Sequence, residues 1–355
     1  MKTDVEFLDK LIRIPSISSD VAQVNVAMDA MRDYLEAHGV ACVMETTEGR
    51  NVLYASTRPG KEQDYLLNAH LDVVPAEPAL FIPRIEDGKM YGRGTDDCKG
   101  CALAIAQILC ELNGKASVGA IFTADEEIGG LSTKYMVEQG YRARKLVMVL
   151  DTSAYAITTA EKGVLDLILR ASGKAAHSSR PWNGDNAIDK LIEGYSKLKA
   201  AWPKNAPGED GDTWFDTMSA TIIKAGTAHN KVPDSAEMLV NIRFTKPGDE
   251  DRIAEFVRKT TGLEVIREES CVPVFCDEND PEIRKLHTAM KKAWPERKIP
   301  ILKMCGATDA RHFALDTTPI ALLGIAGAEC HTDGEWVSID SIADVADMLT
   351  KYMAE

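Results

Sequence analysis

Short apolar runs alternate with longer segments of helical periodicity over most of the chain. The runs that read as strands are Tyr65–Ala69, Val118–Phe122, Leu146–Leu150 and Pro319–Ile325. A continuous apolar run bounded by turn residues is typical of a strand that is covered on both faces. Apolar positions at helical spacing predict helices at Asp4–Ile12, Val21–His38, Cys101–Leu112 and Ile339–Met353. Residues 42–56 alternate loosely and predict an edge hairpin.

This alternation predicts an α/β fold, a mostly parallel sheet with helices on both faces. Such sheets bind ligands outside the carboxyl ends of their strands. His70, the acidic run Asp125–Glu127 and Asp151 each come directly after a strand candidate, and His331 follows the last one. We therefore expect these side chains to converge on one rim of the sheet.

The middle of the chain predicts a separate unit. Its elements are a strand at Val164–Ser172, a helix at Ala187–Lys199, strands at Ser219–Ile223 and Glu237–Phe244, a helix at Arg252–Lys259 and a strand at Leu263–Ile266. The order βαββαβ is that of a ferredoxin-like α+β unit. We expect it to occupy residues 164–278 as an insertion into a domain formed by residues 1–163 and 279–355.

Composition narrows the classes of protein. The chain has 355 residues, of which 45% are hydrophobic and 27% charged, and its net charge of −14 makes nucleic acid or an anionic membrane an unexpected partner. No stretch approaches the roughly 18 apolar residues of a membrane span. The start, MKTDVEFLDK, has acids where an export signal needs apolar residues, so we expect a cytoplasmic protein.

Without export, the eight cysteines do not imply disulfides. Cys98 and Cys101 form a lone C-x-x-C, which we interpret as incidental rather than redox-active or zinc-binding.

The stretch Val118–Gly130 carries the strongest chemical signal. Its apolar strand ends in three adjacent carboxylates, Asp125 to Glu127. Two like charges about 4 Å apart repel by roughly 4 kcal/mol at an effective dielectric near 20, so raised pKa values or bound cations must offset the cost. A solvated acidic turn is the ordinary alternative. If the chain stays extended, Glu127 and Glu126 point to opposite sides, one toward a metal and the other toward substrate.

Other segments supply matching groups. In His70-Leu71-Asp72 the imidazole is a metal ligand candidate, with Asp72 accepting the other ring N–H. Taken alone, this pattern also suits an ordinary loop histidine. In GRGTDDCKG, residues 92–100, Asp96 or Asp97 is either a ligand or a plain helix cap. Two histidines and three carboxylates suit two Zn²⁺ ions with one carboxylate bridging, and Mn²⁺ or Co²⁺ fit nearly as well.

Taken together and in order, these motifs resemble those of the metallopeptidase and amidohydrolase family that includes acetylornithine deacetylase, succinyl-diaminopimelate desuccinylase, aminoacylase, glutamate carboxypeptidase and peptidase T. The resemblance covers most of the chain. The matching motifs are HLDVVP at 70–75, GRGTDDCKG at 92–100, ADEEIGG at 124–130, GKAAHSSRPWNGDNAI at 173–188, HNKVP and NIRF around Asn230 and Arg243, GATDARHF at 306–313 and AECHTDGEWV at 328–337. The chain departs from the pattern at Cys98, where methionine is common, and after Pro75, where the usual tryptophan is missing.

The resemblance implies a zinc exopeptidase-like fold with an inserted lid and dimerisation domain, and two zinc ions per chain. The implied metal ligands are His70, Asp97 as the bridge, Glu127, Asp151 and His331. The implied catalytic residues are Glu126 as general base, Asp72 behind His70, and His177, which reaches the partner subunit's site and stabilises the oxyanion. The implied substrate-binding residues are Asn230 and Arg243, which hold a carboxylate, and Gly306 and Thr308 of a glycine-rich loop. A homodimer through the lid follows if His177 acts in trans.

The function expected from this resemblance is hydrolysis of an amide or peptide bond next to a free carboxylate. An exopeptidase or dipeptidase acting on short peptides is the first interpretation. The alternative is a deacylase of N-acyl amino acids, of the acetylornithine deacetylase or succinyl-diaminopimelate desuccinylase type. A non-catalytic metal-binding scaffold is a further alternative, but the presence of all five ligands together with Glu126 disfavours it.

Overall fold

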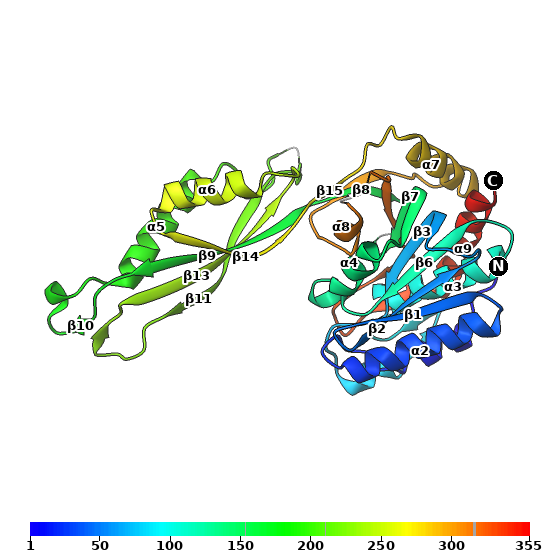
Figure 1. The fold of residues 1–355 in the computed structure, drawn as a ribbon, viewed down its shortest axis with the longest axis horizontal. Helices are drawn as coiled ribbons and strands as arrows, with labels where there is room; N and C mark the ends of the chain where they lie inside the picture. Colours follow the sequence, from blue (N-terminus) through cyan, green and yellow to red (C-terminus); the bar gives the residue numbers. More distant parts are fainter. Residues whose placement is uncertain (153, 210, 315–316) are drawn as a thin grey trace. The chain divides into compact units, whose positions relative to one another are not determined.

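The computed structural model describes residues 1–152, 154–209, 211–314 and 317–355 (Figure 1). The chain divides into two compact units. The first comprises Met1–Ala160, Phe275–Leu302 and Thr308–Glu355, and the second comprises Glu161–Val274 with Lys303–Ala307. The boundaries expected from the sequence lay at 164 and 278, and the short return at 303–307 was not anticipated.

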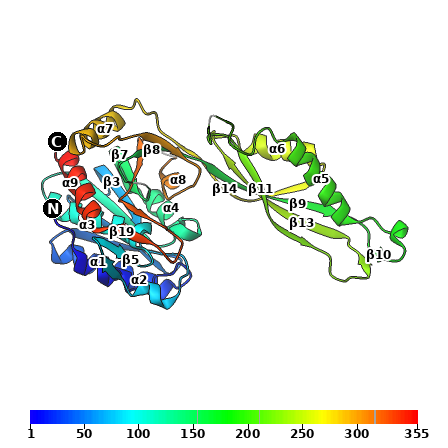
Figure 2. The same ribbon diagram turned by 180° about the vertical axis from the view of Figure 1, so that it is seen from behind.

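Over the described residues, the first unit is built on a mixed sheet of nine strands, shown from opposite sides in Figures 1 and 2. In spatial order its strands are β1 (Ala41–Thr47), β2 (Arg50–Ser56), β6 (Val118–Thr123), β3 (Glu62–His70), β7 (Arg142–Leu150), β17 (Ile320–Leu323), β8 (Ile157–Glu161) and β15 (Val274–Phe275), with β16 (Ile301–Met304) beside β8. The central run from β6 through β3 and β7 to β17 is parallel.

The expectation of a mostly parallel sheet is therefore wrong at its edges. The predicted hairpin at residues 42–56 is confirmed as β1 and β2, which are antiparallel. Their two-residue turn, Glu48 and Gly49, has φ of 51° and 79°. Two residues with positive φ form the turn that joins antiparallel strands, whereas parallel strands need a long crossover. β2 is also antiparallel to β6, and β8 is antiparallel to β17.

Helices and short helical turns connect and cover these strands. They are α1 (Val5–Ile12), α2 (Val21–Ala37), η1 (Pro78–Phe81), η2 (Thr95–Lys99), α3 (Gly100–Leu112), η3 (Glu126–Ile128), α4 (Leu131–Glu138), α7 (Pro281–Ala293), α8 (Ala310–Phe313) and α9 (Ile339–Ala354). Helix α3 is apolar nearly all round and is buried as predicted, in contact with β3, β6 and α9. Helix α7 was not predicted, although Asp280 caps it and Pro281 occupies its first turn, a recognised start signal.

The parallel centre of the sheet explains why the predicted site residues converge. All six residues of β6 are buried. His70, the last residue of β3, pairs with Thr123, the last residue of β6. Neighbouring β7 ends at Leu150, directly before Asp151. Because parallel strands end at the same edge of a sheet, the residues that follow them lie together.

A small sheet brings two loops of the first unit side by side. Its strands are β18 (Gly327–Ala328), β19 (Trp336–Ser338), β5 (Lys89–Tyr91) and β4 (Arg84–Glu86), in that order. β19 pairs with β5 in antiparallel register, Trp336 opposite Tyr91. The loop before Trp336, which carries His331, therefore lies against the loop after Tyr91, which carries Asp97.

The second unit has the βαββαβ order predicted from the sequence. Its elements are β9 (Gly163–Ser172), α5 (Ala187–Ala201), β11 (Thr217–Ala225), β13 (Ser235–Phe244), α6 (Glu250–Thr261) and β14 (Glu264–Cys271), with strand order β11-β13-β9-β14 and antiparallel pairing throughout. A separate short ladder joins β10 (Ala176–His177) to β12 (Lys231–Val232), with η4 (Pro181–Asn183) close to it. Strand β11 lies at an edge of the main sheet.

Candidate metal centre

All five predicted metal ligands lie within one small region of the first unit. His70 Nε2 is 2.8 Å from Asp97 Oδ1 and 3.8 Å from Asp151 Oδ1. On the other side, His331 Nε2 is 3.1 Å from Asp97 Oδ2 and 3.2 Å from Glu127 Oε2. The two oxygens of Asp97 thus face two different histidines, and each histidine has a second carboxylate beside it.

These separations fit two ions that share Asp97. Zinc binds nitrogen and oxygen ligands at about 2.0–2.2 Å, so two ligands of one tetrahedral ion stand roughly 3.4 Å apart. The four measured separations lie on either side of that value. The alternative, in which Asp96 or Asp97 caps helix α3, is wrong for both residues, because the N-cap of α3 is Lys99 and that of η2 is Gly94.

A carboxylate oxygen of the cluster has no hydrogen-bond partner among the described residues. Glu127 Oε1 is buried and accepts no hydrogen bond there. A buried, unpaired carboxylate oxygen is costly unless a cation or donor meets it. His70, Asp97 and Glu127 also offer donor atoms that all lie within 4.8 Å of one another. The residues present therefore fit a group of bound cations.

The pKa values of the cluster are shifted by burial and by the histidines that face the carboxylates. Burial raises the pKa of Glu127 to about 7 and that of Asp151 to about 6. Hydrogen bonding to Asp97 raises the pKa of His331 to about 9. Burial also acts on Asp97, yet its hydrogen bonds with His331 and His70 outweigh it and hold the pKa of Asp97 below its usual range. Perturbed pKa values of this kind concentrate at functional sites, and a bound cation favours the ionised carboxylates.

Asp72 organises the back of the site, although differently from the expectation. The nearest acceptor for His70 Nδ1 is the backbone carbonyl of Asp72 at 2.9 Å, while the Asp72 carboxylate lies 3.4 Å away. Because a carbonyl only accepts, Nδ1 donates to it, and Nε2 faces Asp97. The Asp72 carboxylate accepts the Ser18 hydroxyl at 2.7 Å and the backbone N–H groups of Glu126 at 3.2 Å and Glu127 at 3.4 Å. It therefore anchors the acidic turn.

The acidic turn is not extended, so the predicted alternation of Glu126 and Glu127 is wrong. β6 ends at Thr123, and Glu126 begins the short helical turn η3. The reason is local, because Gly129 N–H and Gly130 N–H bond back to the carbonyls of Glu126 and Asp125. Burial, followed by repulsion from Asp151, raises the pKa of Glu126 to about 10. Glu126 thus lies in the field of the cluster.

Sequence reasoning missed the residue that joins the two ligand-bearing loops. Glu335 Oε2 accepts hydrogen bonds from Arg93 Nη1 at 2.6 Å and Gly94 N at 3.0 Å. Its Oε1 accepts from Asp96 N at 3.0 Å and Asp97 N at 3.2 Å. Both charged side chains are almost fully buried. The signal was available, because Glu335 lies within the AECHTDGEWV motif four residues after His331.

The predicted substrate-binding residues Gly306 and Thr308 lie on either side of a boundary between the two units. Thr308 is buried and accepts a hydrogen bond from Ala310 N at 3.1 Å. Beside it Asp309, which the sequence analysis did not single out, accepts the Thr123 hydroxyl at 2.6 Å, and burial raises its pKa. Gly306 belongs to the Lys303–Ala307 segment of the second unit.

Within the second unit, His177 and Asn230 lie close together. His177 pairs with Lys231 in the β10–β12 ladder, and Ser178 N donates to Asn230 O at 2.9 Å. The exposed ring of His177 contacts Ser179 Oγ through Nδ1 at 2.8 Å. Arg243 lies in the main sheet on β13, on the face that is less buried than the one carrying the apolar residues.

The fold and the cluster define the class of the protein as a metallohydrolase with an α/β domain. A profile of Peptidase family M20/M25/M40 matches residues 66–355, and the chain belongs to this family. It is 30% identical over 302 residues to the probable succinyl-diaminopimelate desuccinylase of Staphylococcus aureus (strain MRSA252), which spans 74% of each chain.

Solved structures agree with the fold. The M20 family metallo-carboxypeptidase Sso-CP2 from Sulfolobus solfataricus superposes with a TM-score of 0.82 at 18% identity, over 100% of this chain and 99% of that one. A dinuclear metal binding peptidase of the M20 family from Bacillus subtilis gives a TM-score of 0.70 at 15% identity, over 99% and 98%. No helix in the described ranges combines the length and apolar character that crossing a membrane requires.

Proposed function

We propose that the chain is a dizinc hydrolase that cleaves an amide bond next to a free carboxylate, acting as an exopeptidase or dipeptidase. The observation that carries the proposal is the position of Asp97, whose two oxygens face His70 and His331 at 2.8 Å and 3.1 Å. One zinc would be held by His70, Asp97 and Asp151, and the other by Asp97, Glu127 and His331. Co²⁺ or Mn²⁺ would suit the same nitrogen and oxygen donors.

When bound, the two ions supply Lewis acidity and a water that is acidic near neutral pH. Glu126 accepts a proton from the attacking water and returns it to the leaving amine. The cations favour the carboxylate form of Glu126, against the burial that raises its pKa to about 10. Asp72 holds Glu126 and Glu127 in place through their backbone N–H groups.

We further infer that the second unit is a lid and dimerisation domain. Arg243 and Asn230 would hold the carboxylate of the substrate, since a guanidinium suits a carboxylate, and Gly306 and Thr308 would border the substrate. His177 would stabilise the oxyanion in the partner subunit's site. The edge strand β11 supports a homodimer, because Ile222 and Ile223 are 50% and 57% exposed there.

A deacylase of N-acyl amino acids is the second candidate. The similarity to a chain named as a probable succinyl-diaminopimelate desuccinylase favours it, while a chain named as a probable carboxypeptidase is also 30% identical and favours the peptidase. Both candidates use the same residues around the reacting carbonyl. They differ in the group on the acyl side of the amide.

The test combines elemental analysis with a substrate panel. Protein purified without chelator is assayed for metal and then offered dipeptides, acetyl-amino acids and succinyl-amino acids, with and without chelator. Close to two zinc ions per chain and chelator-sensitive cleavage are expected, and the preferred substrate separates peptidase from deacylase. A protein that binds no metal and stays inactive after zinc or cobalt is restored would instead be a scaffold.

We also propose a cytoplasmic location. Among the described residues the structure contains no disulfide. A chain with eight cysteines and no disulfide suits a reducing compartment, where disulfides are rare.

A further inference from the structure

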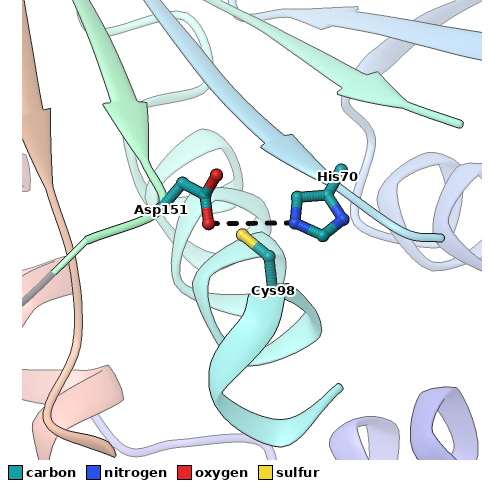
Figure 3. Close-up of side chains that lie close together, drawn as sticks. All are labelled: His70, Cys98 and Asp151. Carbon is teal, nitrogen blue, oxygen red and sulfur yellow. Dashed lines mark ion pairs between the residues drawn. The ribbon is translucent and has the colours of Figure 1, made fainter. Parts of the chain in front are cut away.

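A thiol lies beside the ligands on one side of the metal centre. The sulfur of Cys98 and ligand atoms of His70 and Asp151 all lie within 4.8 Å of one another (Figure 3). The three residues come from the end of β3, from η2 and from the position after β7. In Figure 3 the sulfur points into the space between the carboxylate and the imidazole.

The spacing is that of groups that can share one ion. A thiolate binds zinc at about 2.3 Å and an imidazole at about 2.0–2.1 Å, so these two ligands of a tetrahedral ion lie roughly 3.6 Å apart. His70 and Asp151 are already 3.8 Å apart. A movement of Cys98 on the order of 1 Å, which a small change in its side-chain torsion supplies, completes the set.

Packing alone is the competing explanation for Cys98. Its side chain is fully buried within the apolar core, and its thiol donates a hydrogen bond to Leu150 O at 2.9 Å. Cys101, three residues further on, is equally buried in the same core. In the part of the chain that the structure describes, however, Cys98 belongs to a group of metal-ligating side chains and Cys101 does not. Packing accounts for the burial of both cysteines but not for this difference.

We propose that Cys98 is a ligand of the ion held by His70 and Asp151. The proposal rests on the metal centre of the proposed function and assigns that centre a sulfur donor. On binding, the thiol gives its proton to solvent, its hydrogen bond to Leu150 O breaks, and the thiolate sulfur donates an electron pair to the ion. Thiolate ligands favour zinc over harder ions such as Mn²⁺. This position is therefore zinc-selective, and Cys98 is not the incidental cysteine expected from the sequence.

Cobalt spectroscopy tests the proposal without relying on turnover. In the cobalt-substituted full chain, a sulfur-to-cobalt charge-transfer band in the near ultraviolet is expected, while visible d–d bands report bound cobalt regardless of sulfur. Cys98→Ser should lose the ultraviolet band and keep the visible bands. Cys330→Ser is the matched control, because Cys330 lines the cavity beside Asp97 and Asp151 and is exposed. That variant should keep both bands.

Two further measurements make the result decisive. X-ray absorption of the zinc form should show a scatterer at about 2.3 Å that disappears in Cys98→Ser. In Cys98→Ser the preference for zinc over manganese should fall by at least roughly 10–100-fold, which is the loss of metal affinity seen when a residue that only hydrogen-bonds a ligand is removed. Circular dichroism checks that Cys98→Ser is folded. Cys98→Ala provides a second variant that lacks the sulfur.

The outcomes separate the two proposals. Visible bands without the ultraviolet band in the wild type, or an ultraviolet band that survives Cys98→Ser and Cys98→Ala, would refute the sulfur ligand and leave the metal centre standing. Absence of every cobalt band would refute the metal centre, and the Cys98 assignment with it.

Discussion

The link between Glu335 and Arg93 offers the sharpest test of how the metal centre is held. Glu335→Gln keeps the size of the side chain but replaces one carboxylate oxygen by an N–H donor. Each carboxylate oxygen of Glu335 accepts two hydrogen bonds. Oε2 accepts from the Arg93 guanidinium and the Gly94 N–H, and Oε1 accepts from the N–H groups of Asp96 and Asp97. The variant therefore sets donors against donors on one side and leaves the Arg93 guanidinium, 3% exposed, without a counter-charge.

The size of the effect follows from this burial. Removing one partner of a buried ion pair costs about 3–5 kcal/mol, because the remaining charge is left without compensation. The exposed pair Arg84–Glu86 is the matched control, since its side chains are 61% and 63% exposed. Glu86→Gln should change the free energy of unfolding by no more than about 1 kcal/mol.

Urea denaturation measures both variants, and calorimetric zinc titration measures the site. Because Glu335 anchors the backbone of Asp97, Glu335→Gln should also weaken zinc binding by roughly 10–100-fold, as loss of a partner outside the ligand shell does. A loss of stability below about 1 kcal/mol, equal to that of Glu86→Gln, would refute the assignment of a buried pair. Unchanged zinc affinity in a destabilised variant would refute the positioning role.

Three other predictions concern the base, the charges and the dimer. Glu126→Gln should abolish turnover while metal analysis still finds both ions, and near-normal activity would exclude Glu126 as the base. Chelator-treated protein should lose stability as pH rises from about 4.5 to 9. Folding raises the pKa of Glu127 to about 7 and that of His331 to about 9, so the folded state binds more protons than the unfolded state in that window. Melting temperatures that stay constant over this pH range would contradict the prediction. Ile222→Glu on β11 should turn the dimer into a monomer by light scattering, whereas Val43→Glu on the edge strand β1 should not, and a monomeric wild type would disprove the interface.

Local patterns were enough to find the strands and the groups that follow them. The apolar runs around Leu67, Ile121 and Val149 became the buried parallel strands β3, β6 and β7. Burial on both faces leaves a continuous apolar run in the sequence, so the signal is contained within a few residues. The buried helix α3 could be predicted for the same reason, because its residues are apolar nearly all round.

The direction of edge strands and the shape of the acidic turn were not contained in such runs. A strand reads the same whether its neighbour runs parallel or antiparallel, so β8 and its pairing with β17 could not be derived. The turn at Glu126 depends on backbone hydrogen bonds from Gly129 and Gly130, which compete successfully with an extended chain. The prediction that Glu126 and Glu127 point to opposite sides required an extended backbone, whereas the backbone there forms a short helical turn.

The sequence by itself determined which chemical groups the chain has and which strands they follow. Tertiary structure alone decided which further groups join those that the strand order predicts to meet. Glu335 stands in the AECHTDGEWV motif with no role evident from the sequence, yet pairing of β19 with β5 places it against four donors around Asp97. Cys98 is an isolated thiol in the sequence, yet the parallel register of β3 and β7 brings His70 and Asp151 to its sulfur. Contacts between residues so far apart along the chain depend on register and crossover geometry, which no short sequence window encodes.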